Sequence, residues 1–139
     1  MVNGDYITAK VCDNTGYVFE LKEILSEMKK RGILTLLDCA QSAGTQEIPA
    51  ADYICSACHK GLYGPQGLGI LAIGRDAPLP SPIRTGGTGT RTFDAVQPQD
   101  MPEYLESGTQ SVQSIGALMP ALEFVEKNKK RILIHEIKL

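Results

Sequence analysis

The chain has 139 residues, of which 42% are hydrophobic and 22% are charged. This length suits one domain with a real core, and the composition excludes a disordered or collagen-like chain. Fourteen lysines and arginines stand against sixteen aspartates and glutamates, so the formal charge of −2 provides no basic surface for nucleic acid or an anionic membrane. We therefore expect neither a nucleic-acid partner nor a membrane partner.

The expected compartment follows from the ends and the cysteines. No stretch approaches the roughly 20 apolar residues that cross a bilayer, and the N-terminus lacks the basic start and apolar run of a signal peptide. Four cysteines without an export signal indicate a reducing compartment, where thiols stay free; they are Cys12, Cys39, Cys55 and Cys58. These features predict a cytoplasmic protein.

The first half of the chain alternates strand and helix patterns. Residues 6–11 favour a short strand, followed by a turn. Residues 18–31 carry apolar side chains at helical spacing, and Gly32 suits the end of that helix. The apolar run 33–38 is typical of a parallel strand covered on both faces, and residues 53–57 and 68–73 are further strand candidates. This order predicts a three-layer α/β domain with a mostly parallel sheet.

The second half is less regular. Residues 77–101 are rich in proline and glycine, and no helix or strand fits them. Apolar residues at helical spacing return between Val112 and Val125, and Pro120 predicts a kink or break there. Residues 132–139 resemble a further helix that is cut short.

Two side chains at strand ends suggest chemistry. Asp38 ends one predicted parallel strand, and Lys60 lies just past the next. Ligands of α/β sheets bind outside the carboxyl ends of the strands, so both residues are expected to face one crevice. A desolvated lysine amine can act as a Schiff-base nucleophile, and an aspartate can hold a pyridinium nitrogen in its protonated form.

Four segments carry a family resemblance when taken in order. They are Asp38-Cys-Ala-Gln-Ser-Ala-Gly44, His59-Lys60-Gly-Leu-Tyr-Gly-Pro-Gln-Gly-Leu-Gly69, Gly86-Gly-Thr-Gly89 and Pro102-Glu-Tyr-Leu-Glu-Ser-Gly-Thr109. Together they resemble the class V aminotransferase superfamily, and within it the cysteine desulfurase-like proteins. The resemblance implies pyridoxal 5′-phosphate (PLP) as cofactor, a homodimer, and part of a fold-type I large domain.

The resemblance also implies site residues. Lys60 is expected to form the internal aldimine, Asp38 to pair with the ring nitrogen and Gln41 to bond the phenolate oxygen. His59 is expected to help hold the phosphate, and Thr88 to reach the phosphate of the neighbouring subunit. Two positions at which the family contacts the cofactor carry other residues here, a phosphate donor replaced by Cys58 and an asparagine replaced by Asp13.

The implied activity is removal of sulfur from cysteine, giving alanine and an enzyme persulfide. The resemblance makes residues 1–139 the central part of a large domain, without the N-terminal portion, the C-terminal small domain or the nucleophilic cysteine, so an incomplete active site is expected. Another class V reaction, by an aminotransferase or a selenocysteine lyase, stays open, as does an inactive fragment or pairing scaffold.

Cys55-Ser-Ala-Cys58-His59 also matches a c-type haem attachment pattern, and Cys-x-x-Cys alone could serve redox chemistry or zinc binding. We expect no metal site.

Overall fold

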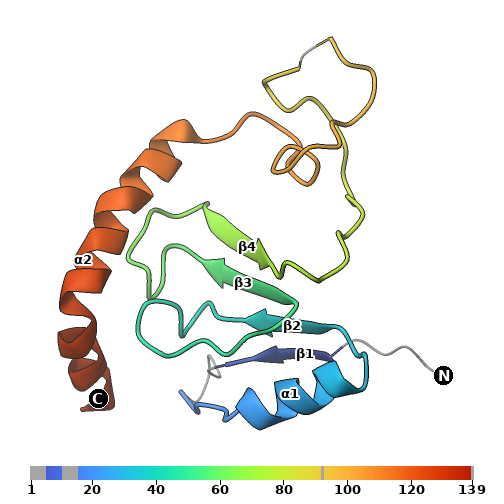
Figure 1. Cartoon of the computed structure of the whole chain (residues 1–139). Helices are drawn as coiled ribbons and strands as arrows, with labels where there is room; N and C mark the ends of the chain where they lie inside the picture. The colour runs from blue at the N-terminus through green and yellow to red at the C-terminus, as the bar shows by residue number, and fades with distance from the viewer. Residues whose placement is uncertain (1–5, 11–15, 92, 139) are drawn as a thin grey trace. The chain divides into compact units, whose positions relative to one another are not determined.

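A computed structural model describes residues 6–10, 16–91 and 93–138 of the chain (Figure 1). The chain divides into two compact units, one made of Met1–Ala77 with Gln113–Leu139 and the other of Pro78–Val112. The first unit holds all the regular structure of the described residues apart from the first residue of the last helix. In chain order the elements are β1 (Tyr6–Ala9), α1 (Lys22–Lys30), β2 (Thr35–Asp38), β3 (Tyr53–Ala57), β4 (Gly69–Ile73) and α2 (Val112–Ile137).

The strands form one sheet in the order β1-β2-β3-β4. Strands β1, β2 and β3 run parallel, and β4 pairs antiparallel with β3. Leu37 pairs with Ile54, and Asp38 pairs with Cys55. The predicted α/β class with a mostly parallel sheet is therefore confirmed.

Burial alternates along β2. Thr35 and Leu37 are buried, Leu36 is half-buried and Asp38 is exposed. The apolar run predicts burial on both faces, but only the face that carries Leu37 is closed. Successive side chains of a strand point to opposite faces, so Asp38 lies on the more open side of the sheet.

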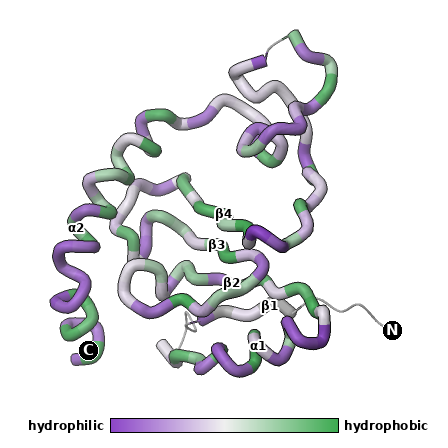
Figure 2. Tube along the Cα trace, in the orientation of Figure 1, coloured by the Kyte–Doolittle hydropathy of each residue, from purple (hydrophilic) through white to green (hydrophobic). Residues whose placement is uncertain are grey.

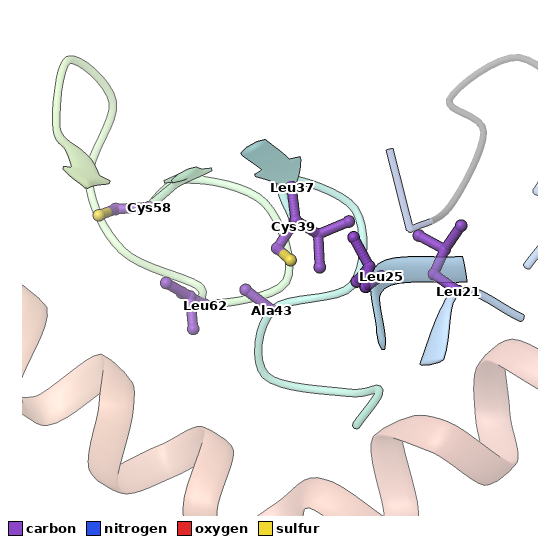
Figure 3. Close-up of a cluster of buried hydrophobic side chains, with 7 residues drawn as sticks. All are labelled: Leu21, Leu25, Leu37, Cys39, Ala43, Cys58 and Leu62. Atoms are coloured by element: carbon purple, nitrogen blue, oxygen red, sulfur yellow. The ribbon is translucent and has the colours of Figure 1, made fainter. Parts of the chain in front are cut away.

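A single core cluster lies on the closed face (Figure 3). Leu37 and Cys39 at the end of β2 are fully buried and meet Leu21 and Leu25 at the start of α1. The cluster continues through the loops that follow β2 and β3, and Leu118 of α2 packs against it. The remaining members of the cluster are Ala43, Cys58 and Leu62.

Helix α1 begins at Lys22, later than the predicted start at residue 18, and ends close to its predicted end. Its apolar stripe buries Leu25, and basic side chains occupy its last turn, where they complement the helix dipole. Gly32 adopts φ +69°, and the N–H of Ile33 donates to the carbonyl of Met28 over 3.0 Å. This left-handed glycine ends the helix at the predicted place.

Helix α2 corrects two expectations. It runs unbroken for 26 residues through Pro120, so of the predicted kink or break the break is wrong, and so is the separate terminal helix. Proline removes one backbone donor, but Gly116 and Pro120 are both exposed, so the freed carbonyl of Gly116 can meet water. Figure 1 shows α2 as one curved ribbon, and Figure 2 shows hydrophobic and hydrophilic stretches mixed along it. Neither α2 nor any other helix among the described residues has the length and apolar character needed to cross a membrane.

The second unit, Pro78–Val112, has no helix or strand among its described residues up to position 111, which confirms the prediction made for residues 77–101. The side chain of Gln97 connects two loop segments of this unit. Its amide oxygen accepts from the N–H of Gly86 at 3.1 Å, and its amide nitrogen donates to the carbonyl of Glu103 at 2.6 Å. The N–H of Gly108 donates to the carbonyl of Gly87 over 2.7 Å. The glycine-rich segment 86–89 is thus held on two sides.

Candidate functional site

Asp38 is the last residue of β2, and its carboxylate is fixed locally. Its Oδ1 accepts a hydrogen bond from the N–H of Ala40 at 2.8 Å, which closes a turn directly after the strand. The side chain is exposed on the open face of the sheet. An anionic group of fixed direction therefore stands at the carboxyl end of a parallel strand.

Lys60 and His59 follow the neighbouring parallel strand. Strand β3 ends at Ala57, two residues before His59. The carbonyl of Lys60 accepts from the N–H of Tyr63 at 2.9 Å, so a tight turn begins at the lysine. Lys60 is half-buried and His59 is exposed. Because β2 and β3 are parallel neighbours, Asp38 and Lys60 leave the sheet at the same edge, as the sequence predicts.

The loops that carry Asp38 and Lys60 touch through their backbones. A Cβ added at Gly61 would overlap the carbonyl oxygen of Ala43, and one added at Gly44 would overlap the carbonyl oxygen of Gly61. Only glycine allows this approach at either position. The contact fixes the backbone beside Lys60 against the loop that follows Asp38.

Gln41 lies in that loop between Asp38 and Gly44, and its side chain is half-buried. It belongs to the same strand edge as Asp38. Thr88 belongs to the second unit, where it is buried and its hydroxyl lies 3.0 Å from that of Thr90. Asp13 falls outside the described residues.

The three described cysteines are free thiols in different surroundings. Cys58 is fully buried in the core cluster, so its thiol offers no surface to a ligand in this conformation. Cys55 is half-buried and pairs with Asp38 across β2 and β3, so both side chains share a face. Burial raises the pKa of the thiols of Cys39, Cys55 and Cys58, and the nearby Asp38 carboxylate adds to the increase at Cys39 and Cys55.

These surroundings bear on the alternative readings of Cys55-Ser-Ala-Cys58-His59. Haem attachment needs two accessible thiols, whereas Cys58 is enclosed. The described residues also contain no group of three or more side chains arranged to hold a metal ion. The arrangement around Cys58 is that of a small apolar core residue.

A cavity lies at the opposite end of the strands from Asp38. Its volume is about 740 Å³, and its lining includes Thr35 at the start of β2, Asp52 just before β3 and Gly74 just after the antiparallel β4. Asp52 Oδ2 accepts from both the N–H and the hydroxyl of Thr35 at 2.8 Å. The cavity lining includes neither Asp38 nor Lys60, so this cavity is distinct from the strand ends that carry them.

Sequence reasoning missed one residue of the Lys60 turn. Tyr63 adopts φ +56°, a left-handed conformation that non-glycine residues seldom adopt. No residue type or spacing in the sequence signals it, because tyrosine has no preference for this region.

Comparison with known proteins agrees with this architecture. The family model "Aminotransferase class-V" matches residues 6–139. A probable cysteine desulfurase of Pyrococcus abyssi is 28% identical over 127 residues, covering 84% of this chain and 31% of the relative. A cysteine desulfurase of Yersinia pestis is 31% identical over 125 residues, covering 84% of this chain and 30% of the relative.

Solved structures give the same assignment. The apo cysteine desulfurase of Thermococcus onnurineus matches with a TM-score of 0.71 and 26% identity, over 88% of this chain and 32% of that one. The cysteine desulfurase CsdA of Escherichia coli matches with a TM-score of 0.68 and 29% identity, over 87% of this chain and 32% of that one. The chain thus spans about a third of the length of these relatives. With a family model that matches nearly every residue, the chain belongs to the aminotransferase class-V family.

Proposed function

We propose that this chain holds PLP at Lys60 and contributes the cofactor-binding part of an enzyme of the cysteine desulfurase type. One observation carries the proposal. Asp38 and Lys60 follow neighbouring parallel strands at the same edge of the sheet, and their loops are in direct backbone contact at Gly44 and Gly61. The family and the curated relatives support the same reading.

The donor set fits the chemistry of the cofactor. PLP offers an aldehyde, a ring nitrogen, a phenolate oxygen and a phosphate, and the strand edge offers an amine, a carboxylate, an amide and an imidazole. These groups belong to Lys60, Asp38, Gln41 and His59. These side chains match the cofactor in two respects: each is of the chemical type that one cofactor group requires, and all four lie at or just after the carboxyl ends of β2 and β3.

Each residue has a defined task in this proposal. When bound, PLP supplies an electron sink that stabilises negative charge on an amino-acid substrate. Lys60 would hold the aldehyde carbon of the cofactor through Nζ, and this nitrogen would take up or return a proton. The Asp38 carboxylate, oriented by the hydrogen bond from the Ala40 N–H, would keep a proton on the ring nitrogen. Gln41 would donate to the phenolate oxygen, and His59 would donate to the phosphate.

The reaction class is sulfur removal from cysteine, which leaves alanine and transfers sulfur to a thiolate as a persulfide. The described thiols suit this acceptor role poorly, because burial raises the pKa of each and lowers the thiolate fraction. We propose that the acceptor thiol is supplied from outside residues 16–138. A homodimer in which Thr88 serves the neighbouring subunit, and a reducing cytoplasmic compartment in which the cysteines stay free, complete the proposal.

A second candidate is a scaffold that pairs with other polypeptide and has no activity of its own. It is favoured by apolar side chains that stand exposed on the edge strand β4, where Ile70 is 40% and Leu71 is 47% accessible. Unpaired apolar edge strands commonly receive a partner.

Cofactor labelling separates the two candidates. Purified protein is titrated with PLP, reduced with borohydride and digested, and the labelled lysine is identified by mass spectrometry. We expect visible absorption on binding and one labelled peptide, which contains Lys60. Lys60→Ala should abolish the label, whereas Lys129→Ala, which changes an exposed lysine of α2, should not. Equal labelling of both variants would refute the assignment, and an unlabelled wild-type protein would favour the scaffold.

A further inference from the structure

The turn that begins at Lys60 contains the one described non-glycine residue with a positive φ. Tyr63 has φ +56°, and its N–H donates to the Lys60 carbonyl at 2.9 Å. The next residue, Gly64, donates its N–H to the Cys58 carbonyl at 2.7 Å. Residues 58–64 therefore form a closed double turn in which the backbone of Lys60 is held from both sides.

A left-handed tyrosine persists only where surrounding contacts favour it. The residue is 55% exposed, so burial in the core does not hold it in place. Phe124 of α2 provides a contact instead: the two ring centroids lie 5.6 Å apart with planes tilted by 56°. That separation is within the range of favourable aromatic pairs.

Helix α2 reaches the same loops at two further points. A Cβ added at Gly64 would overlap a Leu118 methyl group, and one added at Gly44 would crowd a Val125 methyl group. Leu118, Phe124 and Val125 thus bring α2 against both loops of the Asp38–Lys60 edge. Among these contacts, the Tyr63–Phe124 pair is the one that acts on the strained residue.

We propose that Tyr63 is a positioning residue for Lys60, and that the Phe124 ring keeps it in the left-handed conformation that closes the turn. The side chain of Lys60 starts from this backbone, so the turn fixes the point from which the amine reaches its target. The inference rests on the proposed function for its catalytic meaning. The coupling itself is a property of the described residues and can be measured without cofactor.

The experiment measures the reactivity of the Lys60 amine in the cofactor-free protein. The native protein is acetylated briefly, and the rate at Lys60 is read by peptide mass spectrometry relative to the exposed Lys129 of α2. An aromatic contact of this kind shifts the equilibrium between the closed and the open turn by about 2- to 12-fold. Phe124→Ala should therefore raise the relative rate at half-buried Lys60 by about that factor, and Tyr63→Phe, which keeps the ring, should leave it unchanged.

Two controls exclude a general loss of stability. Met119→Ala removes an exposed apolar side chain from the same helix, and Leu25→Ala weakens the core cluster from α1 while leaving the Tyr63–Phe124 pair in place. Neither variant should change the ratio of the acetylation rate at Lys60 to the acetylation rate at Lys129. A Phe124→Ala ratio equal to wild type, or an equal rise in Leu25→Ala, would overturn the proposal.

A second measurement keeps this inference apart from the proposed function. Phe124→Ala should weaken PLP binding by a similar factor in the absorption titration. If the wild-type protein takes up no PLP, the proposed function fails while the acetylation ratios still decide the role of Tyr63. PLP could also bind equally well to the wild-type protein and to Phe124→Ala although the acetylation ratio differs between them. Tyr63 would then position the backbone but not the cofactor, which also overturns the proposal.

Discussion

Replacing Gly61 by alanine tests the contact between the two loops. The new Cβ would overlap the Ala43 carbonyl oxygen, a backbone atom that cannot rotate away. An extra methyl group in a packed site costs about 1–3 kcal/mol, and a rigid neighbour places this site at the upper end. We therefore expect Gly61→Ala to lower the free energy of unfolding by about 3 kcal/mol. With a urea dependence of about 2 kcal/mol per molar, the midpoint falls by about 1.5 M.

Urea unfolding is best followed by circular dichroism, because the chain contains no tryptophan. The matched control is Gly116→Ala in α2, where an added Cβ meets nothing within 4 Å. Alanine is favoured over glycine in a helix by about 1 kcal/mol, so this variant should gain stability. Opposite signs for the same chemical change are the expected outcome. A Gly61→Ala midpoint equal to or above wild type would refute the close approach of the loops.

The remaining predictions concern Thr35 and Cys39. Asp52→Ala removes the acceptor of two 2.8 Å bonds from buried Thr35 and should cost about 1–3 kcal/mol in urea unfolding, whereas Asp76→Ala, at an exposed loop residue, should cost almost nothing. No difference between these variants would contradict the Thr35 network. Burial raises the pKa of Cys39 in the folded state, so its contribution is fully present below the thiol pKa of the unfolded chain and is lost as the pH rises toward the folded value. Between pH 7 and pH 10 the wild-type urea midpoint should therefore fall more than that of Cys39→Ala, and equal falls would count against burial of this thiol.

Local signals predicted much of the first unit. The apolar stripe and Gly32 specified α1, because amphipathic spacing and a left-handed glycine are read from neighbouring residues alone. Asp38 and Lys60 could be assigned to one edge because parallel neighbours place their carboxyl ends together. These features depend on short stretches of chain and one topological rule.

Features that depend on tertiary contacts were not predictable. Pro120 indicated a kink or break, but the helix continues because an exposed helix face tolerates the lost bond. The apolar run before Asp38 indicated burial on both faces, whereas coverage of each face depends on what packs there. The left-handed Tyr63 depends on a ring that lies 61 residues further along the chain, beyond any local pattern. The glycine contact between the two loops is likewise visible only once the strands are paired.

The central claim is that Asp38 and Lys60 serve one cofactor. A crystal structure of the protein after PLP binding and borohydride reduction tests it most directly. We expect continuous density from Lys60 Nζ to the cofactor, with the Asp38 carboxylate at hydrogen-bond distance from the ring nitrogen. Cofactor attached to another lysine, or an Asp38 side chain directed away from the ring, would contradict it.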